Sequence, residues 1–359
     1  MNMNVHRVGV SQKNSWERDF EGIKEDLRHC YWADFSKFKF DRIISSLKKT
    51  VKRQGGIDYS AFPIDFRWHL CSSRLSQGKF DNWDGWEFRS NWSITFQGLN
   101  GGPSAGPVNK WTGQKVKHLV IASEQGIGDE ILYSSAIPEL IVRLGHEAIE
   151  LQCHPRLFQV FRRSFRIKCT PRRVLSQLEP DVPVVALADL FMFYRKDKSH
   201  FPKKPFLKPD LEMRLKFLKD LGNYPKPWIG VGWKSRHGVL PLDELLSKLK
   251  PLGGTLFNLQ YGDTDSRLVD IQPNPMEDME GHINFISCLD RVVSVTQTVV
   301  HEAGGLGVQC DAIKPERGTG EVNPMLWYYG VGESPKISHD HLVYGNMKVW
   351  EGLNGFIAT

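Results

Sequence analysis

Apolar and polar positions follow two different patterns along this chain. Residues 1 to about 100 show helical spacing without strand-like runs, as in Asp26 to Lys49, where leucines and isoleucines recur among charges. A segment rich in glycine and proline, residues 98–110, then precedes a region of short apolar runs that alternate with helical patterns. We therefore predict a helical N-terminal region over 1–100 and an α/β fold after it.

The α/β region divides into two similar halves, 101–222 and 223–335. Strands are predicted in the first half at 118–123, 148–152 and 182–188, and in the second at 228–233, 255–260 and 291–295. Helices are predicted at 129–144, 242–249 and 283–289, and from about residue 298. Strands that alternate with helices favour parallel sheets, and ligands then bind where the strands end.

The loop after the first predicted strand is the sharpest local feature. It contains Glu124, Gln125, Gly126, Ile127, Gly128 and Asp129. Its two glycines allow a tight turn and a close ligand, and Asp129 stands at a helix start near the mouth of a cleft. An ordinary helix-capping role for Asp129 is the alternative. The loop is no dinucleotide fingerprint, because its third glycine position is Ile131, and it is no Walker loop.

Two further segments follow predicted strands in the second half. Thr296, Gln297 and Thr298 open a helix that also carries His301, so backbone N–H groups and hydroxyls there suit a diphosphate. A plain capped helix is the alternative. Lys234, Arg236 and His237 come after the strand WIGVGW, where cations would balance a departing diphosphate. An ordinary basic surface loop is the alternative here.

Positive charge is concentrated between residues 156 and 208. This stretch holds thirteen Lys and Arg against four Asp and Glu, whereas the whole chain has a net charge of +6. It is either a solvated face or a surface for a polyanion. The cations that would attract such an acceptor are Arg162, Arg163, Arg166, Arg172, Arg173, Arg195 and Lys196.

Other sequence signals narrow the class of protein. No charged and apolar leader opens the sequence, and no apolar run approaches the roughly 20 residues that span a bilayer, so we expect a cytoplasmic protein without a membrane span. The six cysteines form no CxxC pair and the twelve histidines form no HExxH motif, so we expect no metal site. The oligomeric state has no sequence signature here.

Together, these segments resemble the nucleotide-sugar glycosyltransferases of the heptosyltransferase-like group, particularly the catalytic region that many bacterial proteins attach to tetratricopeptide repeats. The matches keep their order over most of residues 80–310. They are Trp83 to Trp92 (WDGWEFRSNW), Glu124 to Leu132 (EQGIGDEIL), Gly230 to Ser235 (GVGWKS), Leu259 to Gly262 (LQYG) and Leu289 to Gly307 (LDRVVSVTQTVVHEAGGLG). In addition, Cys30 to Phe35 (CYWADF) is similar to the lead-in to the catalytic region of O-linked N-acetylglucosamine transferase relatives.

The resemblance implies a GT-B fold, in which two Rossmann-like domains face a cleft. The first would take the acceptor, the second the nucleotide sugar, and residues 336–359 would cross back to the first. The resemblance also assigns roles: Asp129 as general base beside the loop Glu124, Gln125, Gly126 and Gly128, Lys234 and Arg236 on the diphosphate, Gln260 near the nucleotide, and Thr296, Gln297, Thr298 and His301 at the phosphate. One departure is Thr296, where the family usually has aspartate in Ser-Val-Asp-Thr-Ser.

The implied reaction is an inverting, metal-independent sugar transfer in which Asp129 removes the acceptor proton. His301 and His237 are alternative bases. We expect a UDP-sugar as co-substrate and no permanently bound cofactor. The basic stretch favours a polyanionic acceptor: a hydroxymethylated DNA base of the kind some bacteriophages make, which would place the protein in the host cytoplasm, or else lipopolysaccharide core. A nucleotide-sugar epimerase and an inactive nucleotide-sugar-binding protein are the alternatives from other classes.

Overall fold

The computed structural model describes residues 109–123, 125–172, 181–236, 238–315 and 337–358, with a few positions between 71 and 86. The predicted helical region over 1–100 lies almost wholly outside these residues. Three predicted site residues, Glu124, Arg173 and His237, also lie outside them.

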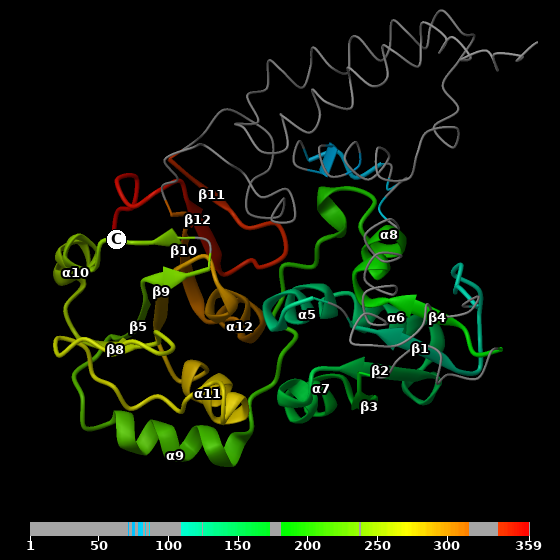
Figure 1. Ribbon diagram of the computed structural model, residues 1–359, viewed down its shortest axis with the longest axis horizontal. Helices are drawn as coiled ribbons and strands as arrows, with labels where there is room; N and C mark the ends of the chain where they lie inside the picture. Colours follow the sequence, from blue (N-terminus) through cyan, green and yellow to red (C-terminus); the bar gives the residue numbers. More distant parts are fainter. Residues whose placement is uncertain are drawn as a thin grey trace, which may run out of the picture.

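A four-stranded sheet of order β3-β2-β1-β4 forms the first half (Figure 1). All three strand pairings are parallel, as the alternating pattern predicts. Its strands are β1 (Leu119–Ala122), β2 (Ile149–Cys153), β3 (Lys168–Pro171) and β4 (Val184–Ala186). Its helices are α5 (Ile127–Ser134), α6 (Ile137–Leu144), α7 (Phe158–Phe165) and α8 (Leu190–Tyr194).

A six-stranded sheet of order β11-β12-β10-β9-β5-β8 forms the second half. Only β11 runs antiparallel to its neighbour. The strands are β5 (Trp228–Gly232), β8 (Thr255–Asn258), β9 (Arg291–Val295), β10 (Gln309–Ile313), β11 (Ser338–Asp340) and β12 (Met347–Trp350), and a separate hairpin joins β6 (Lys234–Ser235) to β7 (Gly238–Val239). The helices are α9 (Leu211–Leu221), α10 (Leu242–Leu249), α11 (Met279–Ile286) and α12 (Thr298–Leu306).

Apolar packing covers both faces of the second sheet, as a parallel sheet requires. Successive residues of β9 point to opposite faces, so Val292 joins one apolar cluster and Val293 the other. The cluster that contains Val292 also contains Ile121 of the first sheet. One continuous apolar core therefore reaches from the first sheet to one face of the second.

The structure corrects two predicted elements. The helix predicted over 129–144 is two helices, because Pro138 is tolerated only in the first turn of a helix and α6 starts just before it. The segment predicted to cross back to the first half instead adds β12 and β11 to the second sheet. Strand β12 pairs with β10, and its residues Met347, Val349 and Trp350 are buried. The segment therefore packs on the second half.

Trp83 and Trp86 pack on the first half, next to α8. Their rings meet edge to face with centroids 5.3 Å apart. The Trp83 indole donates to the Arg195 carbonyl at 2.8 Å, and that of Trp86 donates to the Ala188 carbonyl at 3.3 Å. Buried indoles with hydrogen-bond partners fix this edge of the fold. Across the described ranges, no helix is long and apolar enough to cross a bilayer.

Candidate active site

An arginine that pairs with a buried carboxylate holds the loop between β1 and α5. Gln125 has a φ of 63°, and Gly126 is the residue before α5. Arg172 holds this turn, because its guanidinium donates to the Gln125 carbonyl at 2.9 Å and to the Ser123 hydroxyl at 3.0 Å. Arg172 also pairs with Glu130, the residue after Asp129. Burial raises the pKa of Glu130, against the lowering effect of Arg172.

Asp129 stands at the third position of α5 and is half buried. The backbone N–H of Gly126 donates to Asp129 Oδ2 over 3.2 Å. Asp129 therefore caps the start of its own helix, which satisfies one of the N–H groups that a helix leaves without a partner. The capping role that the sequence allowed is present, and it fixes the direction of the carboxylate.

The start of α12 lies at the end of β9 in the neighbouring sheet. Thr296 is buried and its N–H donates to the Ile313 carbonyl at 3.1 Å, while Thr298 begins the helix half buried. The Gln297 amide donates to the Ser294 hydroxyl at 2.9 Å. A Cβ at Gly232 would lie 2.5 Å from that Gln297 nitrogen, so a larger residue at the end of β5 would have to displace the Gln297 side chain.

Helices α5 and α12 lie side by side between the two sheets (Figure 1). Their first turns meet at Gly128, where a Cβ would lie 2.9 Å from His301 Cδ2 and 3.5 Å from Thr298 Cα. Asp129 follows Gly128 directly. The predicted base and the predicted phosphate-binding helix, 169 residues apart in sequence, are thus brought to one seam.

His301 is buried in this seam, beside a tyrosine that the sequence did not single out. His301 Nδ1 lies 3.1 Å from the Tyr344 hydroxyl. Burial lowers the pKa of His301 to about 3, so its ring is a weak base at neutral pH. The pKa of Tyr344 is raised, mainly by burial and also by the charges of Cys310 and Asp129. No sequence signal marks Tyr344, because it comes from the C-terminal loop before β12.

Lys234 begins the hairpin that follows β5. Gln260 Oε1 accepts the backbone N–H groups of Trp233 at 3.0 Å and Lys234 at 2.7 Å. The Lys234 ammonium is exposed and lies 3.8 Å from Asp263 Oδ2, and Arg236 is exposed as well. Strands β5 and β9 are parallel neighbours, so Lys234 and the start of α12 leave the same edge of the sheet. Gln260, predicted near the nucleotide, uses its side-chain oxygen to hold this backbone turn.

The predicted acceptor cations are not one exposed surface. Arg195 is fully buried, where it pairs with Glu139 at 2.6 Å and stacks near the rings of Phe191 and Phe201. Arg172 holds the α5 loop, as described above. Arg162, Arg166 and Lys196 are exposed. Including Arg195 in the acceptor surface was wrong, because composition cannot separate a buried, paired arginine from a solvated one.

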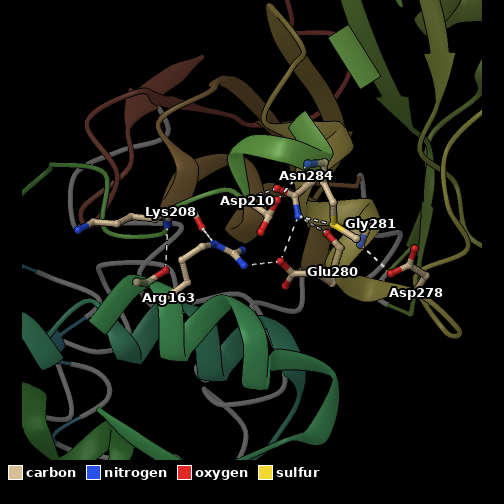
Figure 2. A network of polar contacts seen from close by, with 9 residues as sticks. Arg163, Lys208, Asp210, Asp278, Glu280, Gly281 and Asn284 are labelled. Atoms are coloured by element: carbon tan, nitrogen blue, oxygen red, sulfur yellow. Dashed lines mark hydrogen bonds and ion pairs between the residues drawn. The ribbon is translucent and has the colours of Figure 1, made fainter. Parts of the chain in front are cut away.

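Arg163 lies at a second contact between the two halves, shown in Figure 2. Its guanidinium pairs with Glu280 of α11 at 2.6 Å and donates to the Lys208 carbonyl at 2.7 Å. The Lys208 N–H donates to the Ser164 hydroxyl, and the Asp210 N–H donates to Asn284 Oδ1 at 2.6 Å. This polar contact, with the α5–α12 seam, sets the position of one sheet relative to the other.

Metal-binding residue types do not gather in the described ranges. Within them, no group of three or more His, Cys, Asp or Glu side chains is placed to hold a metal ion. The cationic groups at the sheet edge are instead Lys234 and Arg236.

No protein-family model matches the chain. Protein FlbA of Caulobacter vibrioides is 26% identical to it over 241 residues, 56% of this chain and 40% of FlbA, so the match spans less than half of that relative. A glycosyl transferase family 9 structure from Veillonella parvula has a TM-score of 0.42 at 13% identity, covering 58% of this chain and 84% of its own. The E. coli ADP-heptose lps heptosyltransferase II has a TM-score of 0.44 at 11% identity, covering 65% and 90%. Similarities this distant assign neither a family nor an activity to the chain.

Proposed function

We propose that this chain is a glycosyltransferase that moves a sugar from a nucleotide sugar to an acceptor hydroxyl. The observation that carries the proposal is the contact of Gly128 with His301, because it places Asp129 beside the first turn of α12. The residue whose carboxylate can take a proton then comes directly after the contact with a helix whose first N–H groups can bind a diphosphate.

The donor would lie along the carboxyl edge of the second sheet. The N–H groups at the start of α12 and the Thr298 hydroxyl bind the diphosphate, and Lys234 with Arg236 supplies positive charge. Thr296 stands where the resembled family has aspartate and is buried, so the chain between β9 and α12 carries no charge at this position. This arrangement needs no metal ion, so transfer should persist in the presence of a chelator.

The chemistry proposed is a single displacement at the anomeric carbon. Asp129 takes the acceptor hydroxyl proton, the acceptor oxygen bonds to the anomeric carbon, and the bond to the diphosphate breaks with inversion. Lys234 and the α12 start stabilise the charge that develops on the leaving nucleoside diphosphate. His301 is the weaker candidate for the base, since its pKa is about 3.

The acceptor is proposed to be polyanionic, because Arg162, Arg166 and Lys196 remain exposed in the half that the resemblance assigns to the acceptor. Hydroxymethylated DNA and lipopolysaccharide core both have this character. The salt dependence of binding distinguishes these acceptors from a neutral one. Each DNA phosphate neutralised on binding adds about −0.9 to the slope of log affinity against log salt concentration. A flat slope with duplex DNA removes DNA from the proposal.

The central experiment compares Asp129→Asn with wild type. Asparagine keeps an oxygen for the Gly126 N–H but cannot take a proton, so we expect an intact fold and a loss of transfer of at least about 10²-fold. Intact mass of hydroxymethylated DNA and of lipopolysaccharide core after incubation with UDP- and ADP-sugars reports the transfer. The matched control is Asp278→Asn, which alters the cap of α11 away from the seam. Full transfer by the Asp129→Asn protein would exclude Asp129 as the base.

A further inference from the structure

Helices α11 and α12 share a fully buried contact between a histidine and a carboxyl group. His282 of α11 and Glu302 of α12 each have side chains only 1% exposed, and His282 Nδ1 lies 2.9 Å from Glu302 Oε2, out of hydrogen-bond alignment. Burial of charged groups costs solvation free energy that their attraction does not fully restore, so such a contact adds little to stability. The role of this contact follows from its neighbours.

The second ring nitrogen of His282 leads towards the sheet edge. His282 Nε2 lies 2.9 Å from Gln272 Oε1, and the Gln272 amide nitrogen donates to the Gln260 carbonyl at 3.3 Å. That second bond fixes the orientation of the Gln272 amide, so its oxygen faces His282 and accepts from it. Both ring nitrogens of His282 therefore lie next to side-chain oxygen atoms, one of Glu302 and one of Gln272.

Gln260 passes this constraint to the backbone of the donor loop. Its side-chain oxygen accepts the N–H groups of Trp233 and Lys234, and its own N–H donates to Asn258 Oδ1 at 2.7 Å. The Asn258 amide in turn donates to the carbonyl of Asp263, the acid beside the Lys234 ammonium. This series of contacts, called the relay below, connects Glu302, one residue after His301, with the turn that presents Lys234.

We propose that Glu302, His282 and Gln272 are positioning residues that fix Lys234 relative to the start of α12. Glu302 belongs to α12, so the relay connects Lys234 with the helix whose start would bind the same diphosphate. This inference rests on the proposed function for its ligand, a nucleoside diphosphate. Its structural half, the ordering of the Trp233–Lys234 turn, stands independently of that function.

The test uses Gln272→Leu, which interrupts the relay at a half-buried position and leaves the His282–Glu302 contact in place. Glu302→Gln is the second variant. Hydrogen exchange of the peptide containing Trp233 and Lys234, read by mass spectrometry, should quicken in both variants. Calorimetric affinity for UDP and for ADP should fall about tenfold in whichever nucleotide the wild type binds. Asp311→Asn is the control, since it breaks another buried pair, Arg291–Asp311, that does not touch Gln260.

The outcomes are distinct. Faster exchange and weaker binding in both variants, but not in Asp311→Asn, support the relay. Unchanged exchange overturns it, and faster exchange with unchanged nucleotide affinity overturns its role in donor binding. If the wild type binds neither UDP nor ADP, the proposed function and the donor role fail together, while exchange still decides whether the relay orders the turn.

Discussion

Gly128 of α5 lies directly against His301 of α12, close enough that a Cβ at residue 128 would come within 2.9 Å of the imidazole. This contact joins the two halves of the chain at the residue next to Asp129. The His301 side chain is buried, so it has little room to give way.

Gly128→Ala is expected to push α5 away from α12. The added methyl group meets His301 and Thr298, so we expect a loss of about 1–3 kcal/mol in the free energy of unfolding, measured with urea. Displacement of Asp129 should lower transfer by up to about 10²-fold. Gly126→Ala is the matched control, because its Cβ would meet only Asp129 Oδ2, at an ordinary 3.4 Å. Equal behaviour of the two variants would contradict the tight seam.

Arg172→Met is expected to leave the Glu130 carboxylate without its charged partner. Glu130 is fully buried, so loss of its partner should cost about 3–5 kcal/mol in urea unfolding. The double variant Glu130→Gln with Arg172→Met should recover much of this loss, because no buried charge then lacks a partner. Additive losses in the double variant would show that the two side chains do not act as a pair.

His301 predicts an acid-sensitive stability. Its folded pKa of about 3 lies below the unfolded value of 6.5, so the unfolded chain binds more protons between these values. The stability that comes from neutral His301 is thus full above pH 6.5 and is lost as the pH falls towards 3, by up to about 5 kcal/mol. Urea unfolding of wild type and His301→Gln across this range isolates the effect.

The two curves should converge towards low pH, since glutamine takes up no proton. The control is His200→Gln, which changes a histidine that is 49% exposed and lies outside the seam. A constant gap between wild type and His301→Gln would mean that folding does not lower the pKa of His301.

The contact in Figure 2 predicts coupling between Arg163 and Glu280. Both side chains are partly buried, so each of Arg163→Met and Glu280→Gln should cost about 1–3 kcal/mol in urea unfolding, with a double variant that costs less than the sum. Asp243→Ala removes an ion pair with Arg267 in which Asp243 is 90% exposed, and it should cost less than about 1 kcal/mol. Strict additivity at 163 and 280 would rule out the coupling.

The sequence predicted best where a single pattern determines the structure. The apolar runs at β1, β5 and β9 have few alternatives, and the helix from Leu242 to Leu249 was predicted with its observed bounds. Strand β3 was missed because its residues, Lys168 to Pro171, are mostly polar or exposed at the sheet edge. The turn at Ser135 and Ala136 was missed although Pro138 signalled it.

Local patterns predicted the candidate site as separate loops, and the resemblance implied that they face one cleft. Glycine spacing and hydroxyl residues marked the starts of α5 and α12, but their meeting depends on tertiary packing that no local pattern encodes. The partners inside the site were missed for the same reason. One signal was available for Glu130, because an acidic residue stands there among the apolar positions of its helix. Tyr344 and the relay from Glu302 to Gln260 had no such signal.

The bond from the Gly126 N–H to Asp129 means that the proposed base also holds the first turn of α5. A carboxylate that has just received a proton accepts hydrogen bonds less strongly, so the first turn of α5 would slacken when the acceptor loses its proton. Return of that proton to water would tighten the turn again. The loop would then return to its starting conformation only after Asp129 loses its proton. A slow proton release would appear as a solvent isotope effect on turnover under saturating substrates.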